Sequence, residues 1–129
     1  MDVLLSGGLS GTMAALKTMI RQIIMTIPTT MTFFERFETD ILAGKKTITI
    51  RDESENNYVP GTVVRVSTLE EGREFCSLEI LSVEPILFDE LSDFHAVQEN
   101  MSLPVLKDVI QEIYPGIEQL YVIIYKLSQ

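Results

Sequence analysis

The strongest structural constraint in this sequence is an apolar run near the C-terminus, which reads Leu-Tyr-Val-Ile-Ile-Tyr over 120–125. β-Branched and aromatic residues favour an extended backbone, so we expect a strand over Gln119–Lys126. Neither set of alternating positions in this run is polar, which is typical of a strand that is buried on both faces. The chain must therefore build a sheet with covered faces around this segment.

Three further segments are rich in β-branched residues and are bounded by turn-forming residues, as short strands are: Thr47–Arg51, Thr62–Ser67 and Glu74–Val83, the last limited by Pro85. Apolar residues at helical spacing predict helices over Phe33–Gly44, within Phe88–Asn100 and from Ser102 to about Ile113. Turns are expected at 52–60, 70–73 and 115–116. This order predicts an α+β fold, and the short strands favour a small curled sheet or β-barrel with flanking helices.

Composition excludes several classes of protein. The 129 residues suffice for about one domain, and they include one cysteine and one histidine, Cys76 and His95. These counts exclude a disulfide-stapled fold and a zinc site built from several histidines. We expect Cys76 to belong to the core, because it lies in an alternating strand, and His95 to be structural or on the surface. No nucleophile elbow or phosphate-binding loop motif is present in the sequence.

The net charge of -9 disfavours generic binding to nucleic acid, because an acidic surface repels phosphates. Four cations nevertheless lie close together in the sequence: Arg36, Lys45, Lys46 and Arg51. A locally basic strip on an acidic body suits a small polar ligand better than a long polyanion. The alternative is that these residues form an ordinary solvated charged face.

Residues 1–31 differ from the rest of the chain, since they hold only one of the 19 acidic residues. We expect a helix from Thr12 to about Met25, ended by Pro28. The longest uncharged stretch is shorter than the roughly 20 residues that a transmembrane helix needs, although a basic amphipathic helix on a membrane surface is an alternative. We expect residues 1–31 to be a dispensable extension and 32–129 to form the functional domain.

The segment Gly44–Arg51 resembles the signature of the ASCH domain family, which runs glycine, any residue, lysine, two residues, glutamate, one residue, arginine. Gly44, Lys46 and Arg51 match this pattern, whereas Thr49 stands in place of the glutamate. With that departure the segment is similar to the bacterial subfamily of N4-acetylcytidine amidohydrolases. The likeness continues through five segments: Thr32–Phe37, Asp40–Gly44, Thr47–Glu55, Gln98–Met101 and Ile113–Gly116. The resemblance implies a PUA-like barrel with flanking helices.

The same resemblance implies that Lys46, Thr49 and Glu99 are the catalytic groups and that N4-acetylcytidine is hydrolysed to cytidine and acetate without a metal or other cofactor. Arg51 is a candidate for contacting the substrate. A free lysine is protonated at neutral pH, so a lysine base requires burial or nearby cations such as Lys45, Arg51 or Arg36 to favour its neutral form. Glu99 in contact with it opposes this effect when ionised and suits the role of proton donor.

Chemistry alone leaves three assignments open for Thr49: nucleophile, water-orienting hydroxyl and plain strand residue. Positions three apart in a regular strand point to opposite faces. Lys46 and Thr49 can therefore meet only if the chain is irregular there, or if Lys46 lies in the loop after Gly44 and curls back.

The competing hypothesis is a non-catalytic PUA-like module that binds RNA or a nucleotide, with Lys45, Lys46 and Arg51 meeting phosphates. The net acidic charge argues against it, because each phosphate contact needs a cation. We therefore expect a small nucleoside substrate, no stable nucleic-acid partner, no membrane association, a monomer and a cytoplasmic location.

Overall fold

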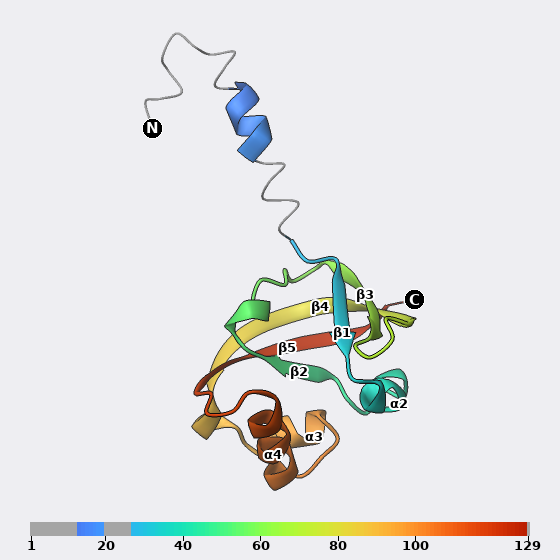
Figure 1. Ribbon diagram of the computed structural model, residues 1–129, viewed down its shortest axis with the longest axis vertical. Coiled ribbons are helices and arrows are strands. Elements are labelled where there is room, and N and C mark those ends of the chain that lie inside the picture. Colours follow the sequence, from blue (N-terminus) through green and yellow to red (C-terminus); the bar gives the residue numbers. More distant parts are fainter. Residues whose placement is uncertain (1–12, 20–26, 129) are drawn as a thin grey trace.

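The computed structural model describes residues 13–19 and 27–128, and its centre is one five-stranded sheet (Figure 1). The strands are β1 (Thr30–Phe33), β2 (Ile48–Arg51), β3 (Val63–Thr68), β4 (Glu74–Leu87) and β5 (Gln119–Ser128). Within residues 27–128 the α-helices are α2 (Glu38–Leu42), α3 (Asp93–Gln98) and α4 (Leu103–Ile113). Short 3-10 helices are η2 (Glu35–Phe37), η3 (Glu53–Glu55) and η4 (Phe88–Glu90). The α+β prediction is confirmed.

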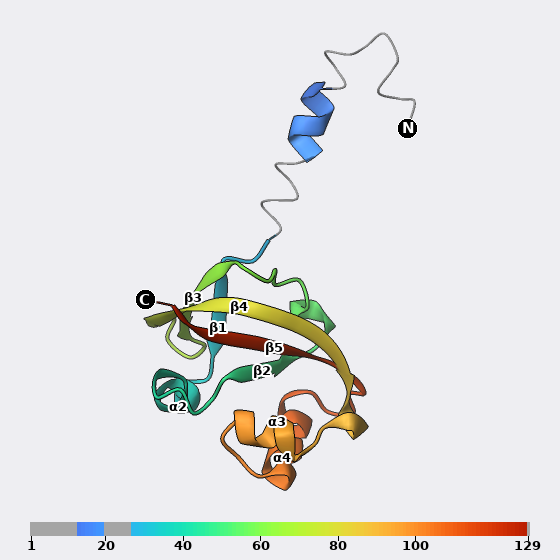
Figure 2. The same cartoon turned by 180° about the vertical axis from the view of Figure 1, so that it is seen from behind.

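The sheet has the strand order β1-β3-β4-β5-β2, in which only the β1–β3 pair is parallel. The long strands β4 and β5 bend together through the molecule, as Figures 1 and 2 show. A register shift between Ile80 and Ser82 inserts an extra residue into β4, and such a bulge bends a strand. The sheet is curled as expected but stays open, because β1 and β2 are its two edges and do not pair in the described part of the chain.

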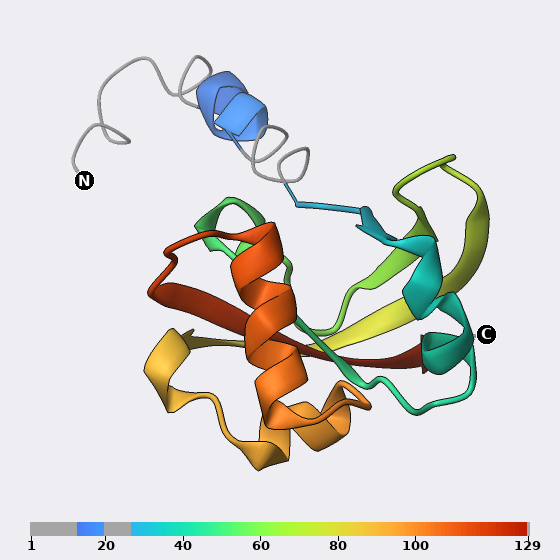
Figure 3. The ribbon, with the colours of Figure 1, turned by 60° about the horizontal axis from the view of Figure 1, so that its bottom comes forward.

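The C-terminal run takes the place in the sheet that its composition predicts. β5 lies between β4 and β2, and Leu120, Ile123 and Tyr125 are all nearly inaccessible to solvent. Residues from both faces of β5 are buried, because Val122 joins one hydrophobic cluster and Ile123 the other. One cluster fills the curl of the sheet between β1, β3, β4 and β5. The second cluster joins β2 and β5 to α3 and α4, with α4 lying across β5 (Figure 3).

The helix predicted over Phe33–Gly44 is wrong in its first residues. Thr30–Phe33 forms the edge strand β1, in which Met31 and Phe33 point inward and the two threonines outward, and η2 and α2 follow it. The threonine–apolar alternation is the period of a strand, but the aromatic residues that follow at helical spacing masked it. The predicted helix end is confirmed, because Gly44 has a φ of 73° directly after the last turn of α2.

The limit that Pro85 was expected to set on the third predicted strand is also wrong. β4 continues through Pro85 to Leu87, and Pro85 is paired in register with Tyr121 of β5. Strand β3 accompanies β4 only as far as Glu79, so this part of β4 has a neighbour on one side. A proline is tolerated there, because no ladder on the free side needs its missing N–H.

The other predicted elements are confirmed within one or two residues. Strands occupy Ile48–Arg51, Val63–Thr68 and Gln119–Ser128, and α3 lies within the predicted helical region. Ser102 caps α4, since its Oγ accepts a hydrogen bond of 3.4 Å from the backbone N–H of Val105. The turns at Gly72 and Gly116 both require a positive φ.

The N-terminal segment behaves partly as expected. Residues 13–19 form a helix whose side chains are exposed, whereas the remainder of the helix predicted from Thr12 to Met25 lies outside the described residues. Strand β1 begins at Thr30, inside the segment 1–31, and the Met31 side chain is buried in the core. Within the described residues, no helix has the length and apolar character needed to cross a membrane.

Candidate active site

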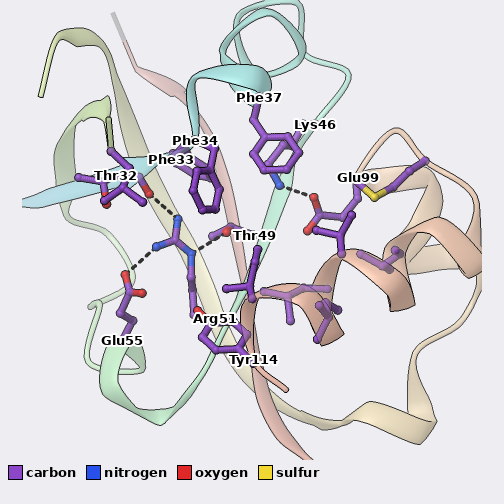
Figure 4. Close-up of a pocket in the computed structure, with 17 residues that line it drawn as sticks. Thr32, Phe33, Phe34, Phe37, Lys46, Thr49, Arg51, Glu55, Glu99 and Tyr114 are labelled. Carbon is purple, nitrogen blue, oxygen red and sulfur yellow. Dashed lines mark hydrogen bonds and ion pairs between the residues drawn. The ribbon is translucent and has the colours of Figure 1, made fainter. Parts of the chain in front are cut away.

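A cavity of about 210 Å³ opens where the edge strands β1 and β2 meet α4 (Figure 4). The two sides of its lining differ in chemistry. Aromatic rings from β1 and η2 form one side, and aliphatic residues of α4 form the other. Polar side chains lie between these walls: Lys46, Thr49, Arg51 and Glu55 come from β2 and the segments that flank it, and Glu99 comes from the end of α3. The cavity therefore has two apolar sides with a polar strip between them.

Lys46 lies in the loop between α2 and β2, and its side chain is only 3% exposed. Its Nζ donates to the carboxylate of Glu99 and, at 2.9 Å, to the backbone carbonyl of Ile48. The ammonium also lies 5.0 Å from the ring centroid of Phe37. Burial lowers the pKa of Lys46 from its ordinary value, and the negative charge of Glu99 opposes this shift.

Glu99 reaches the same point from the other side of the cavity, although it is 53 residues away in sequence. It is the last residue of the turn that ends α3, and the next residue, Asn100, adopts a left-handed φ of 58°. Asparagine tolerates this conformation better than most residues do. The backbone N–H of Thr47 donates to the carbonyl of Gln98 at 2.8 Å, which joins the two segments beside the Lys46–Glu99 pair.

Thr49 and Arg51 lie on one face of β2, two residues apart, and both are buried. The Nε of Arg51 donates a hydrogen bond of 2.8 Å to the Oγ1 of Thr49. The same guanidinium donates to Glu55 at 2.6 Å and to the carbonyl of Thr32 at 2.8 Å. Because the threonine oxygen accepts from a cation, its own hydrogen is left free to point into the cavity.

The structure answers how Lys46 and Thr49 share a site despite their spacing. Gly44 turns the chain after α2, and β2 begins only at Ile48, so Lys46 precedes the strand and curls back along it to the Ile48 carbonyl. This is the loop arrangement that the sequence left open. In the described part of the chain, Lys46 and Thr49 share no direct hydrogen bond; the cavity brings two pairs together, Lys46 with Glu99 and Thr49 with Arg51.

Two of the four cations of the predicted basic strip are outside the cavity lining. Arg36 lies on the outer side of η2, stacked on Phe34 and Phe37, and forms an exposed ion pair of 3.4 Å with Glu112 of α4. Lys45 is exposed. The strip is therefore divided between the solvated surface and a buried polar site.

The site contains residues that sequence reasoning did not single out: Glu55, Tyr114 and the aromatic side formed by Phe33, Phe34 and Phe37. Glu55 is four positions after Arg51, but this spacing pairs charges only on a helix, and Arg51 ends a strand, so no local signal identified Glu55. The phenylalanines were recognised, but as the apolar face of a helix. Nothing local in the sequence places Tyr114 here, because it arrives at the end of α4.

Cys76 and His95 take no part in the cavity. Cys76 packs half-buried against the core cluster of β4, where burial raises the pKa of its thiol to about 11. The Nδ1 of His95 accepts from the backbone N–H of Ser92 at 3.1 Å, which caps α3. Among the residues that the structure describes, no cluster of histidine, cysteine and carboxylate side chains is arranged to hold a metal.

Comparison with known proteins supplies independent findings. No family model matches the chain. It is 78% identical over 103 residues to the N(4)-acetylcytidine amidohydrolase of Vibrio atlanticus, a match that covers 80% of this chain and 99% of that protein. It is 56% identical over 105 residues to the protein of the same name from Vibrio cholerae, covering 81% of this chain and 100% of the relative.

Solved structures agree on the fold. The ASCH domain from Lactobacillus crispatus superposes with a TM-score of 0.63 at 16% identity, covering 83% of this chain and 84% of that one. The ASCH protein from Zymomonas mobilis gives a TM-score of 0.61 at 12% identity, covering 78% and 66%. The ASCH fold expected from the resemblance is therefore confirmed.

Proposed function

The chain belongs to the N(4)-acetylcytidine amidohydrolase family, and we propose that its cavity hydrolyses N4-acetylcytidine with Thr49 as nucleophile, Lys46 as general base and Glu99 as proton donor. The observation that carries this assignment is the Lys46–Glu99 pair, buried beside a threonine hydroxyl in one cavity. An amide needs these three functions: attack on the carbonyl carbon, removal of the attacking proton and protonation of the leaving nitrogen.

In the first half of the reaction, the Thr49 Oγ bonds to the acetyl carbon while its proton passes to the neutral amine of Lys46. Glu99 then protonates N4 as the C–N bond breaks, so cytidine leaves and the acetyl group stays as an ester on Thr49. Lys46 then passes the proton it took from Thr49 to Glu99, which restores the neutral amine and the carboxylic acid. In the second half, Lys46 accepts a proton from water as the water oxygen attacks the ester. Lys46 returns this proton to the Thr49 oxygen as the ester C–O bond breaks, and acetic acid leaves and ionises to acetate.

The buried Lys46–Glu99 pair suits this series of reaction steps, because one proton can be held between its two members. With the proton on the carboxyl group, the pair is a neutral amine beside a carboxylic acid, which provides the base and the acid together. Burial penalises the alternative form with two charges, and it also lowers the pKa of Lys46. The Phe37 and Phe33 rings beside Nζ help to keep water away from the amine.

Arg51 assists in a second way, because its hydrogen bond fixes the rotamer of Thr49. A cation that donates to the threonine oxygen also stabilises the negative charge that develops on it when its proton leaves. Arg51 is thus a positioning residue for the nucleophile in this proposal, and its role as a substrate contact is secondary.

The alternative of a module that binds RNA finds less support in the geometry. Lys46 and Arg51 are 3% and 8% exposed and are both paired with glutamates, so neither is available to a phosphate chain. An uncharged nucleoside carries no phosphate, so it can bind without exposed cations. We propose that the enzyme is monomeric and cytoplasmic, in line with a chain whose one cysteine precludes an internal disulfide. Light scattering after size exclusion tests the monomer.

The direct test is incubation of the purified chain with N4-acetylcytidine, followed by chromatography for cytidine and acetate. We expect the two products in equal amounts and no loss of rate after treatment with a chelator. Lys46→Met should be inactive, whereas Lys45→Met, the same change at the exposed neighbour, should retain activity. Turnover that is equal in both variants contradicts the assignment, and a short RNA bound tightly at physiological salt without turnover supports the binding module.

A further inference from the structure

The side chains of the polar strip in the cavity become more exposed to solvent from one end of the strip to the other. Side-chain exposure is 3% for Lys46 and 6% for Glu99 at one end, 10% for Arg51 in the middle and 34% for Glu55 at the other end. Figure 4 shows the same order. Lys46 and Glu99 lie on one side of Thr49, whereas Arg51 and Glu55 lie on the other side. A ligand that reacts at Lys46 and Glu99 and follows the polar strip therefore reaches solvent at Glu55.

The two ends of a nucleoside match the two ends of this cavity. The acetyl amide of N4-acetylcytidine and its ribose are attached at opposite ends of the pyrimidine ring. With the amide at the buried end and the ring between the aromatic side and α4, the ribose comes to lie at the exposed end, next to η3. Its hydroxyl groups then need hydrogen-bond acceptors, since they are leaving water.

Glu55 is the carboxylate that the cavity offers at this end. The lining contains two carboxylates, and the other one, Glu99, is committed to Lys46. The Oε1 of Glu55 accepts from Arg51 at 2.6 Å, and the Glu55 side chain is 34% exposed. Arg51 therefore holds the carboxylate in place, and a carboxylate has acceptor sites for a ligand beyond this one bond.

We propose that Glu55 is a specificity residue that recognises the ribose hydroxyls of the substrate through its carboxylate. This inference rests on the proposed function and extends it, because it names the part of the substrate that binds at the open end. A carboxylate that accepts hydrogen bonds from sugar hydroxyls distinguishes a ribonucleoside from its free base or its deoxy analogue.

The test compares three substrates that share the same acetyl amide: N4-acetylcytidine, N4-acetyl-2′-deoxycytidine and N4-acetylcytosine. For the full-length parent and for Glu55→Ala, kcat/KM is measured on each. We expect the variant to lose at least about tenfold more kcat/KM on the ribonucleoside than on the free base. Glu53→Ala is the matched control, because it removes an exposed carboxylate of the same 3-10 helix that does not line the cavity.

The pattern of losses separates the two roles of Glu55. Because it also anchors Arg51, its removal lowers kcat on all three substrates; only sugar recognition makes the loss depend on the sugar. An equal fold loss on all three substrates overturns the proposal, as does a parent that does not favour the ribonucleoside over the free base. A parent that hydrolyses none of the three contradicts the proposed function itself, which is a distinct result.

Discussion

The Nη2 of Arg51 at the end of β2 donates a hydrogen bond of 2.8 Å to the carbonyl of Thr32 on β1. These strands are the two edges of the sheet, so a side chain crosses the opening where the curled sheet does not close. The same guanidinium holds the Thr49 hydroxyl and the Glu55 carboxylate. The residue that ties the edges together therefore also sets the geometry of the site.

Replacing this residue by lysine tests that relationship. A single ammonium cannot meet three acceptors that lie in different directions, so Arg51→Lys should lower both kcat and stability. We expect a loss of about 1–3 kcal/mol in the free energy of unfolding, measured by urea denaturation, because buried acceptors lose their partner. Arg73→Lys is the control at an exposed ion pair with Glu38 and should leave both quantities almost unchanged. Equal effects of the two substitutions contradict the bridging role.

Lys46→Arg tests the general base. Arginine keeps the positive charge and the reach toward Glu99 but cannot lose a proton near neutrality. We expect kcat to fall by about 10²–10⁴-fold with a modest change in KM, measured by steady-state kinetics. Lys45→Arg, one position earlier and exposed, should behave like the parent. Activity of Lys46→Arg within a few-fold of the parent would favour a simple charge contact instead.

The buried pair should give a bell-shaped dependence of kcat/KM on pH. At low pH a second proton enters the pair, and Lys46 can no longer act as a base. At high pH the shared proton is lost, and no acid remains to protonate the leaving nitrogen. Because burial lowers the pKa of Lys46, the alkaline fall should begin below its ordinary value of 10.5.

Glu99→Gln serves as the control for this profile. The substitution removes the negative charge that raises the pKa of Lys46, so that pKa should fall further. Residual activity should then rise with pH as the neutral amine forms and should show no alkaline fall, because the group proposed to protonate the leaving nitrogen is gone. A variant that keeps the bell shape of the parent shows that another group supplies the acid.

Truncation at two points tests where the domain begins. Removal of residues 1–26 leaves the described strand β1 intact, so we expect an unchanged melting temperature and unchanged turnover. Removal of 1–31 also deletes the buried Met31 and the Thr30 carbonyl, which accepts from the Tyr58 hydroxyl at 2.7 Å. That shorter chain should melt at a lower temperature. A large drop in melting temperature on removal of residues 1–26 alone would show that part of this segment contributes to the fold.

The fold was predictable where one local pattern dominates. The apolar run of β5, the serine cap of α4 and the glycine after α2 all specify their structures within a few residues. Strand β1 was missed because four residues carry a weak signal, and its pairing with β3 is parallel and distant in sequence. Pro85 was misread because its tolerance depends on which side of β4 lacks a neighbour.

The site was predictable only in part. Lys46 and Thr49 were singled out because a signature covers their segment, and Glu99 because the resemblance extends to Gln98–Met101. No local property of Glu99 distinguishes it from the other acidic residues before the chain folds. The division into a Lys46–Glu99 pair and a Thr49–Arg51 pair, and the presence of Glu55 at the open end, depend on tertiary contacts that spacing does not specify.

Thr49 carries the central claim, and its variants separate the three assignments that chemistry leaves open. Thr49→Val preserves shape and strand propensity, so the protein should fold with turnover lower by several orders of magnitude. Thr49→Ser should recover part of the activity, because a hydroxyl returns with a looser rotamer. Thr49→Glu restores the commoner ASCH signature and should abolish hydrolysis.

The most direct measurement is rapid acid quenching of the parent during turnover of N4-acetylcytidine, followed by intact-mass spectrometry and peptide mapping. The mechanism predicts one acetyl group, located on Thr49 in the parent and absent from Thr49→Val. The same quench of Lys46→Arg should show less acetyl ester than the parent does, because formation of the ester needs the base. An active Thr49→Val, or an acetyl group found on another residue, would contradict the nucleophile.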